Sequence, residues 1–143
     1  MEATVRWRDG VSFEVESGTG HVVTTDGPPD SGGRDLGPRP MELVLMGTGG
    51  CASFDVVDFL RKGRQDVVGC ECRLTAERVD AVPAVFSAIH MHFVVTGHDL
   101  SESKVARAVT LSADKYCSAS IMLAAGGVQI THTWEIVAAD QPR

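Results

Sequence analysis

The chain has little positive charge, and it lacks the segments that mark membrane or exported proteins. Its 13 Lys and Arg residues are outnumbered by 19 Asp and Glu, which gives a net charge of −6, whereas a nucleic-acid footprint needs clustered basic residues. No uninterrupted apolar run reaches 18 residues, so no transmembrane helix is predicted. The segment Met1–Arg8 lacks the apolar core of a secretory signal. We therefore expect a protein that binds neither nucleic acid nor membrane.

Internal repeats and linker-like segments between domains are also missing. A length of 143 residues with 43% hydrophobic residues suits one globular domain, residues 1–143. The chain has four cysteines, and without an export signal these favour reduced thiols in the cytoplasm.

Charge is absent from Leu43 to Phe54, and this run predicts a central helix. Pro40 is tolerated in the first turn of a helix, and Gly63 is a typical C-terminal stop. A helix that is apolar on all sides is normally buried, and the sheet of one small chain covers only one side. We therefore expect a homodimer in which two such helices lie together, with Cys51 at the middle of each.

Alternating apolar and polar residues predict strands on both sides of this helix. An Asp9-Gly10 hairpin joins the first two strands, and we expect a second helix to open at Asp99 with Glu102 completing a capping box. The expected strands cover 3–8, 11–16, 21–25, 68–77, 85–95 and 128–136, and helical pieces cover 99–116 and 118–125. Hairpins with separated helices indicate an α+β fold with mainly antiparallel sheet.

The residues with chemical potential are cysteines and histidines. Cys51 and Cys117 are 66 positions apart, which fits no zinc-ligand spacing, so only the fold can bring them together. Buried free cysteines often act as small hydrophobic residues, and this reading is strongest for Cys70 and Cys72, on the apolar face of their strand. His90 and His92 share a strand face and could be metal ligands, but no third ligand with matching spacing is evident, so solvated or sheet-packed histidines are the default. From the residues alone, the chain is a dimeric α+β protein with one candidate thiol pair.

Two motifs extend this reading. The segment Gly37–Met46 followed by Gly49-Gly50-Cys51 resembles the central helix of the OsmC/Ohr family, named for osmotically induced protein C and organic hydroperoxide resistance protein. The segment Val105–Leu123, with Asp114-Lys115-Tyr116-Cys117-Ser118, resembles the second half of that family's signature, most closely in its YhfA-like branch. The resemblance implies an intertwined homodimer, with sheets wrapped around two central helices and two active sites at the subunit interface.

The resemblance also implies roles for individual residues. Cys51 matches the peroxidatic cysteine of the family's peroxidases and Cys117 the resolving cysteine. An arginine from the loop before the central helix, Arg34 first and Arg39 second, would hold the thiolate. The family's supporting glutamate directly follows a proline, but here Met41 follows Pro40 and the carboxylate comes one residue later, at Glu42. An external dithiol, often lipoyl in these enzymes, would restore the thiols, with no bound cofactor or metal.

The function expected on this basis is the thiol-dependent reduction of organic hydroperoxides in oxidative stress defence. A sulfenic acid forms first and is then converted to a disulfide, which a dithiol reduces by exchange. Because Met41 occupies the usual glutamate position, a second reading stays open. In that reading the protein is not an enzyme, and its dimer interface binds an apolar ligand or senses redox state.

Overall fold

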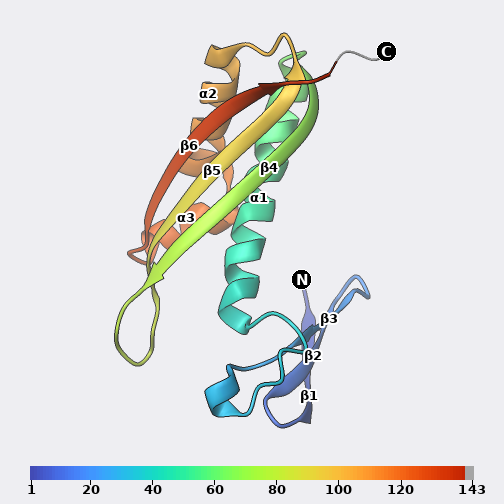
Figure 1. Cartoon of the computed structure of the whole chain (residues 1–143), viewed down its shortest axis with the longest axis vertical. Helices are drawn as coiled ribbons and strands as arrows, with labels where there is room; N and C mark the ends of the chain where they lie inside the picture. Colours follow the sequence, from blue (N-terminus) through green and yellow to red (C-terminus); the bar gives the residue numbers. More distant parts are fainter. Residues whose placement is uncertain (141–143) are drawn as a thin grey trace. The chain divides into compact units, whose positions relative to one another are not determined.

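The computed structural model describes residues 1–140 and divides into two compact units, Met1–Met46 and Gly47–Arg143. The boundary between the two units falls inside helix α1 (Pro40–Lys62). Figure 1 labels the elements of both.

Unit 1 is a three-stranded antiparallel meander, β1 (Ala3–Asp9), β2 (Ser12–Ser17) and β3 (Val22–Thr25), in the order β1-β2-β3. The expected hairpin is present, and Gly10 adopts φ +52° in its turn, a conformation that glycine reaches without strain. The short 3₁₀ helix η1 (Pro29–Ser31) follows in the loop after β3.

Helix α1 spans Pro40–Lys62, as the sequence predicts. Its buried positions form one stripe, Thr48, Gly49, Ala52, Val56 and Leu60. A Cβ atom at Gly49 would lie 2.5 Å from Leu74 Cδ1 of the neighbouring strand, so this glycine permits close approach of helix and sheet. In the single chain only this stripe is covered, as expected of the sheet of one chain, and Phe54 on another side of the helix is 72% exposed.

The same helix has a length and an apolar composition sufficient to cross a membrane. The sequence argument, which looked for an uninterrupted apolar run, did not reveal this property. The core helix of a folded domain has the same length and composition, and α1 packs on a sheet at Gly49. We therefore assign α1 to the core of the fold.

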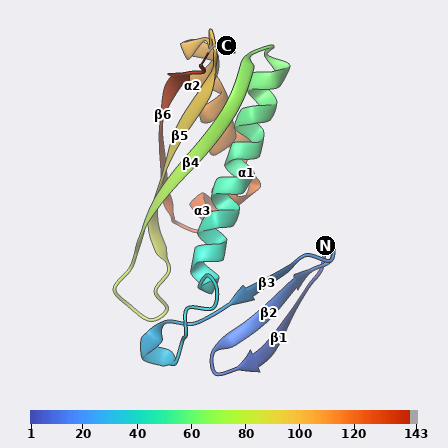
Figure 2. The same ribbon diagram turned by 45° about the vertical axis from the view of Figure 1, so that its right-hand side comes forward.

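Unit 2 contains the second sheet, formed by β4 (Asp66–Arg78), β5 (Phe86–His98) and β6 (Gln129–Ala138) in that order (Figure 1). The β4–β5 pair is antiparallel and the β5–β6 pair is parallel. β5 and β6 are parallel, unlike the two strands of a hairpin, because the helices between them return the chain to the edge where β5 begins. The helices lie on one face of the sheet (Figure 2), and the core side chains of β5 point to them: Ile89, Met91, Phe93 and Val95.

The helical connection has three parts: α2 (Glu102–Leu111), the π-helical turn η2 (Ser112–Tyr116) and α3 (Ser118–Ala125). The prediction that Asp99 caps α2 is wrong. Ser101 is the cap, and its hydroxyl accepts the N–H of Lys104, while Asp99 adopts φ +48° two residues earlier. A π-helical turn inside a helical segment often marks a functional site, and this one directly precedes Cys117.

Candidate active site

The structure brings Cys51 and Cys117 together from different elements of unit 2. Cys51 lies in the middle of α1, and Cys117 joins η2 to α3. The two thiols lie close enough for Cys51 to raise the pKa of Cys117, and Cys117 Sγ lies 3.9 Å from the carbonyl oxygen of Thr48, one turn before Cys51. All four cysteines are free thiols. Cys51 and Cys117, the candidate thiol pair of the sequence, are therefore neighbours in the fold.

Two influences act in opposite directions on Cys117, which is fully buried at 0% exposure. Burial raises the pKa of its thiol above the usual value, while the hydroxyl of Ser120 and the backbone N–H of Ser120 lower it. These two donors lie 3.2 Å and 3.4 Å from the sulfur. The hydrogen bond and charge of Cys51 raise the pKa again, because they favour the protonated form of Cys117 as a donor. Burial wins, and Cys117 keeps its proton at neutral pH.

The two strand cysteines face the same helix. Burial raises the pKa of Cys70, and burial likewise raises the pKa of Cys72 to about 11 against a lowering hydrogen bond from Ser53. Cys72 is also close enough to Cys117 for their charges to interact. Both strand thiols are therefore protonated at neutral pH and weak nucleophiles, and the closeness of Cys72 to the helical pair is a feature the sequence analysis missed.

Ser112 connects α1 to the turn that carries Cys117. Its hydroxyl donates to the carbonyl oxygen of Ala52 at 2.8 Å, and it lies close enough to Asp55 to lower the pKa of that carboxyl group. Its own carbonyl accepts the N–H of Cys117 at 2.8 Å. Ser112, the first residue of the π-helical turn, thus bonds to α1 through its side chain and to Cys117 through its backbone carbonyl. In the sequence, Ser112 is only one of several polar residues in the predicted helical segment 99–116.

The predicted arginine and glutamate lie in unit 1. The guanidinium of Arg34 pairs with the carboxylate of Asp9. The carboxylate of Glu42 accepts the backbone N–H of Arg39 at 2.8 Å, which is half of a capping box at the start of α1. In unit 1, Glu42 therefore acts as a helix cap, one residue after Met41.

The loop that holds Arg34 is organised by Asp26, which the sequence analysis did not single out. Asp26 is only 2% exposed, and its carboxylate accepts three backbone N–H groups, from Gly27 at 2.8 Å, Arg34 at 2.9 Å and Leu36 at 3.2 Å. The Arg34 bond is the largest cause that holds the pKa of Asp26 below its ordinary value. An aspartate just before a Gly- and Pro-rich loop was the available signal.

A hollow lies between α1 and Cys70 of β4, and its walls are mainly apolar. Its lining includes Gly50, Phe54, Val57 and Cys70, with Asp58 and Arg61 at its charged end. Gly50 precedes Cys51 directly, so the hollow adjoins the helical turn that carries the thiol.

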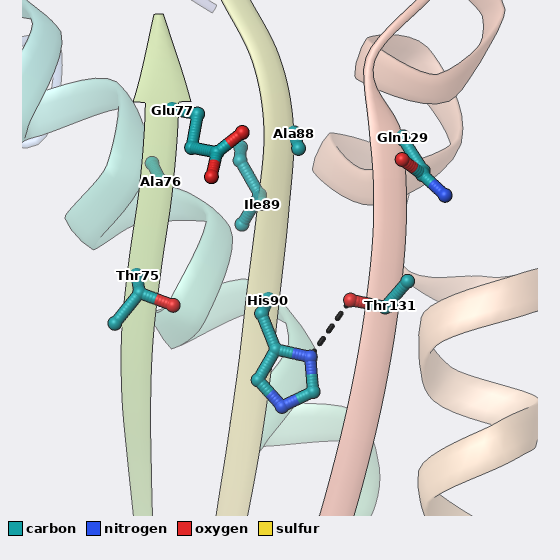
Figure 3. Close-up of a pocket in the computed structure, with 8 residues that line it drawn as sticks. All are labelled: Thr75, Ala76, Glu77, Ala88, Ile89, His90, Gln129 and Thr131. Carbon is teal, nitrogen blue, oxygen red and sulfur yellow. Dashed lines mark hydrogen bonds between the residues drawn. The ribbon is translucent and has the colours of Figure 1, made fainter.

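A second hollow lies on the opposite face of the sheet, away from the helices (Figure 3). Its polar side chains are Thr75, Glu77, His90, Gln129 and Thr131, and the His90 ring lies 2.7 Å from the hydroxyl of Thr131. The His90 and His92 rings alternate with threonine hydroxyls along the strands, so both are sheet-packed. Within residues 1–140, no group of three His, Cys, Asp or Glu side chains is placed to hold a metal ion.

The fold and the thiol pair together define a class of α+β proteins, in which a long central helix carries one cysteine of a pair. Comparison with known proteins agrees. Residues 32–133 match the family model described as OsmC-like protein, and the chain is 53% identical to Protein YhfA of Escherichia coli K12 over 97% of this chain and 100% of that one. The chain therefore belongs to the OsmC-like family.

Solved structures show the same fold. A hypothetical protein from Aquifex aeolicus VF5 is 27% identical with a TM-score of 0.83, covering 97% of each chain. An organic hydroperoxide resistance protein OsmC from Legionella pneumophila is 16% identical with a TM-score of 0.72, covering 94% of this chain and 95% of that one. The expected OsmC-like α+β fold is confirmed.

Proposed function

We propose that this protein is a thiol-dependent peroxidase that reduces organic hydroperoxides through Cys51 and Cys117. The observation that carries the proposal is the closeness of these two thiols, which lets Cys51 act on the pKa of Cys117. Family membership supports it, since the family includes proteins described as organic hydroperoxide resistance proteins. The apolar hollow beside Gly50 supports an organic substrate.

The chemistry follows from the order in which the thiols react. The Cys51 thiolate attacks one oxygen of the hydroperoxide, so an S–O bond forms and the O–O bond breaks, and the alkoxide takes a proton and leaves as an alcohol. Cys117 then attacks the sulfenic acid, and a disulfide and water form. An external dithiol, with a lipoyl group as the leading candidate, exchanges with the disulfide and restores both thiols.

The division of labour rests on the difference in environment. Cys117 is fully buried and holds its proton, which suits a group that reacts second. Cys51 is only partly buried and adjoins a helical turn with missing side chains, where a substrate can approach. In this proposal the guanidinium of Arg34, or of Arg39 as second candidate, stabilises the Cys51 thiolate at the subunit interface. Glu42, at the start of α1, is the supporting carboxylate.

We further propose that residues 1–143 act as one OsmC-like domain within a cytoplasmic homodimer. The exposed apolar side chains along α1 support this arrangement, because a second copy would bury them: Val44, Met46 and Phe54 are all more exposed than a core helix allows.

The deciding experiment is a thiol titration of the reduced protein after one equivalent of cumene hydroperoxide. We expect a loss of two thiols per chain, and peptide mapping should find a Cys51–Cys117 disulfide with Cys70 and Cys72 still reduced. Turnover with dihydrolipoamide should be faster with the organic hydroperoxide than with hydrogen peroxide. If all four thiols survive the hydroperoxide, the protein is not a peroxidase, and the apolar-ligand reading replaces this one.

A further inference from the structure

The π-helical turn η2 decides which of two neighbouring residues faces the interior of unit 2. An α-helix turns by about 100° per residue, so an uninterrupted helix would keep Tyr116 on the buried face of α2 and turn Cys117 away from it. That face is formed by Val105, Ala108, Val109 and Ser112. The structure has the reverse arrangement, in which Tyr116 is 51% exposed and Cys117 is 0% exposed. The wide turn therefore brings the thiol into the core.

One backbone hydrogen bond closes this turn. The N–H of Cys117 donates to the carbonyl oxygen of Ser112, five residues earlier, at 2.8 Å, whereas an α-helix pairs residues four apart. The turn thus contains one residue more than an α-helical turn. The position of the Cys117 side chain consequently depends on where Ser112 is held.

Ser112 is held by α1 at the residue that follows Cys51. Its side chain is 0% exposed, and its hydroxyl donates to the carbonyl oxygen of Ala52 at 2.8 Å. A polar side chain is costly in a core unless it is hydrogen-bonded, so the bond to Ala52 accounts for a serine at this place. Two hydrogen bonds through one buried residue therefore connect the neighbour of Cys51 to Cys117.

We propose that Ser112 is a positioning residue for the second step of the cycle, in which Cys117 closes the disulfide. It fixes η2 on α1, so that the Cys117 sulfur stays within reach of Cys51. In this step the Cys117 sulfur bonds to the sulfur of the Cys51 sulfenic acid, the S–O bond breaks, and the hydroxide leaves as water with the Cys117 proton. This inference rests on the proposed function and deepens it.

The chemistry of Cys117 makes its position important. Burial raises the pKa of its thiol, so little of the reactive thiolate exists at neutral pH. A weak nucleophile reacts quickly only when it is held in the right geometry, because orientation raises its effective concentration. The bond from Ser112 to Ala52 supplies that orientation before the sulfenic acid forms.

The test compares Ser112→Thr with Ser112→Val, two side chains of nearly the same shape of which only threonine keeps the hydroxyl. We expect Ser112→Val to convert sulfenic acid to disulfide about fivefold more slowly than Ser112→Thr, the usual net effect of one hydrogen bond, while the first attack by Cys51 keeps its rate. Ser112→Ala, which adds no volume to the core, should show the same loss relative to the wild type. Rapid mixing with cumene hydroperoxide, timed quenching and mass spectrometry measure both steps.

A second readout does not depend on peroxide. Oxidised dithiothreitol exchanges with Cys51 and Cys117, so that the protein disulfide and reduced dithiothreitol form, and alkylation followed by mass spectrometry gives the equilibrium constant. Ser112→Val should lower this constant about fivefold relative to Ser112→Thr, because the thiols are less well held together. Equal constants in the two variants, or equal slowing of both steps with peroxide, overturn the inference.

Two control variants separate positioning from other effects. Val105→Ala removes packing from a fully buried position of α2, so it should lower the melting temperature and keep the wild-type equilibrium constant. Ser112 also lowers the pKa of Asp55, and Asp55→Asn should likewise keep the constant. A fivefold loss in either control overturns the inference. If Ser112→Val shifts the equilibrium and the wild type consumes no hydroperoxide, the positioning of Cys117 by Ser112 stands and the proposed function fails.

Discussion

Cys117 in unit 2 and Asp26 in unit 1 are both buried ionisable groups, yet the fold moves their pKa values in opposite directions. Three backbone N–H groups converge on the carboxylate of Asp26 and keep it charged. Cys117 receives two donors from Ser120, and burial together with Cys51 still keeps it protonated. The number of donors relative to the cost of burial decides the charge of each group. The charged carboxylate of Asp26 holds its loop in place, whereas the thiol of Cys117 keeps its proton at neutral pH.

The largest expected effect lies in the cysteine region. Cys51→Ser should abolish hydroperoxide consumption, because a serine hydroxyl is not ionised at neutral pH. Cys117→Ser should still allow one attack and then stall as a sulfenic acid that a dimedone reagent traps and that is open to overoxidation. Mass spectrometry of the trapped adduct checks both variants. An adduct on Cys117 in the Cys51→Ser protein would reverse the assigned roles.

The next effect concerns the exposed face of α1 beside the thiol pair. A side chain at Gly50 meets open space within the chain, so Gly50→Leu should leave the fold of a single copy intact. It should disrupt a dimer by overpacking, at a cost of roughly 1–3 kcal/mol or more, which light scattering at micromolar concentration detects.

Gly49→Ala is the contrasting variant to Gly50→Leu. Its new methyl group meets Leu74, so the melting temperature should fall whether or not the protein is a dimer. A wild-type protein that is already a stable monomer would refute the predicted homodimer.

A smaller effect is expected from Asp26→Asn. The folded pKa of Asp26 lies below its ordinary value of 3.8, so its stabilising effect is complete above pH 3.8 and is lost as the pH falls through the folded pKa. The variant should melt a few degrees lower at neutral pH, and this deficit should shrink in strong acid. Melting curves at several pH values test this, with Asp30→Asn as control. A deficit that is constant with pH would mean that the charge of Asp26 is irrelevant.

The smallest effect should come from Ser120→Ala. Losing one hydrogen bond to the Cys117 sulfur, worth about 1 kcal/mol, should slow disulfide formation about fivefold. The first attack by Cys51 should be unchanged, and the slower step should leave more sulfenic acid for dimedone. Stopped-flow thiol fluorescence or quenched alkylation separates the two steps. Equal slowing of both steps would show that Ser120 supports the fold rather than the reactivity of Cys117.

Much of the fold was predictable because it depends on local patterns. Alternating residues predict the strands β4 and β5, and an uncharged run predicts the helix α1. The predicted strands and central helix are all present. The start of α2 was misplaced because Asp99 and Ser101 are both good capping residues, and only the backbone conformation at Asp99 distinguishes them. The parallel pairing of β6 depends on how the intervening helices return, which no short pattern records.

The candidate site was predictable only in part. The positions of Cys51 and Cys117 in two helical motifs pointed to the pair, whereas Asp55, Ser112 and Ser120 passed as ordinary polar residues. The significance of Asp55 and Ser112 comes from contacts between segments about 60 residues apart, as in the bond from Ser112 to Ala52, whereas Ser120 bonds Cys117 three residues before it. Burial and donor geometry arise from such contacts, and a sequence pattern contains neither.

The sequence by itself determined the length and apolar character of α1, the strand pattern and the placement of one cysteine in each helical segment, because these depend on neighbours a few residues away. The tertiary structure alone decided that Cys117 lies against Cys51 and Thr48, and that the carboxyl group of Asp55 lies beside Ser112. Charge state and reactivity follow from desolvation and hydrogen bonding, and these forces act between atoms that only folding brings together.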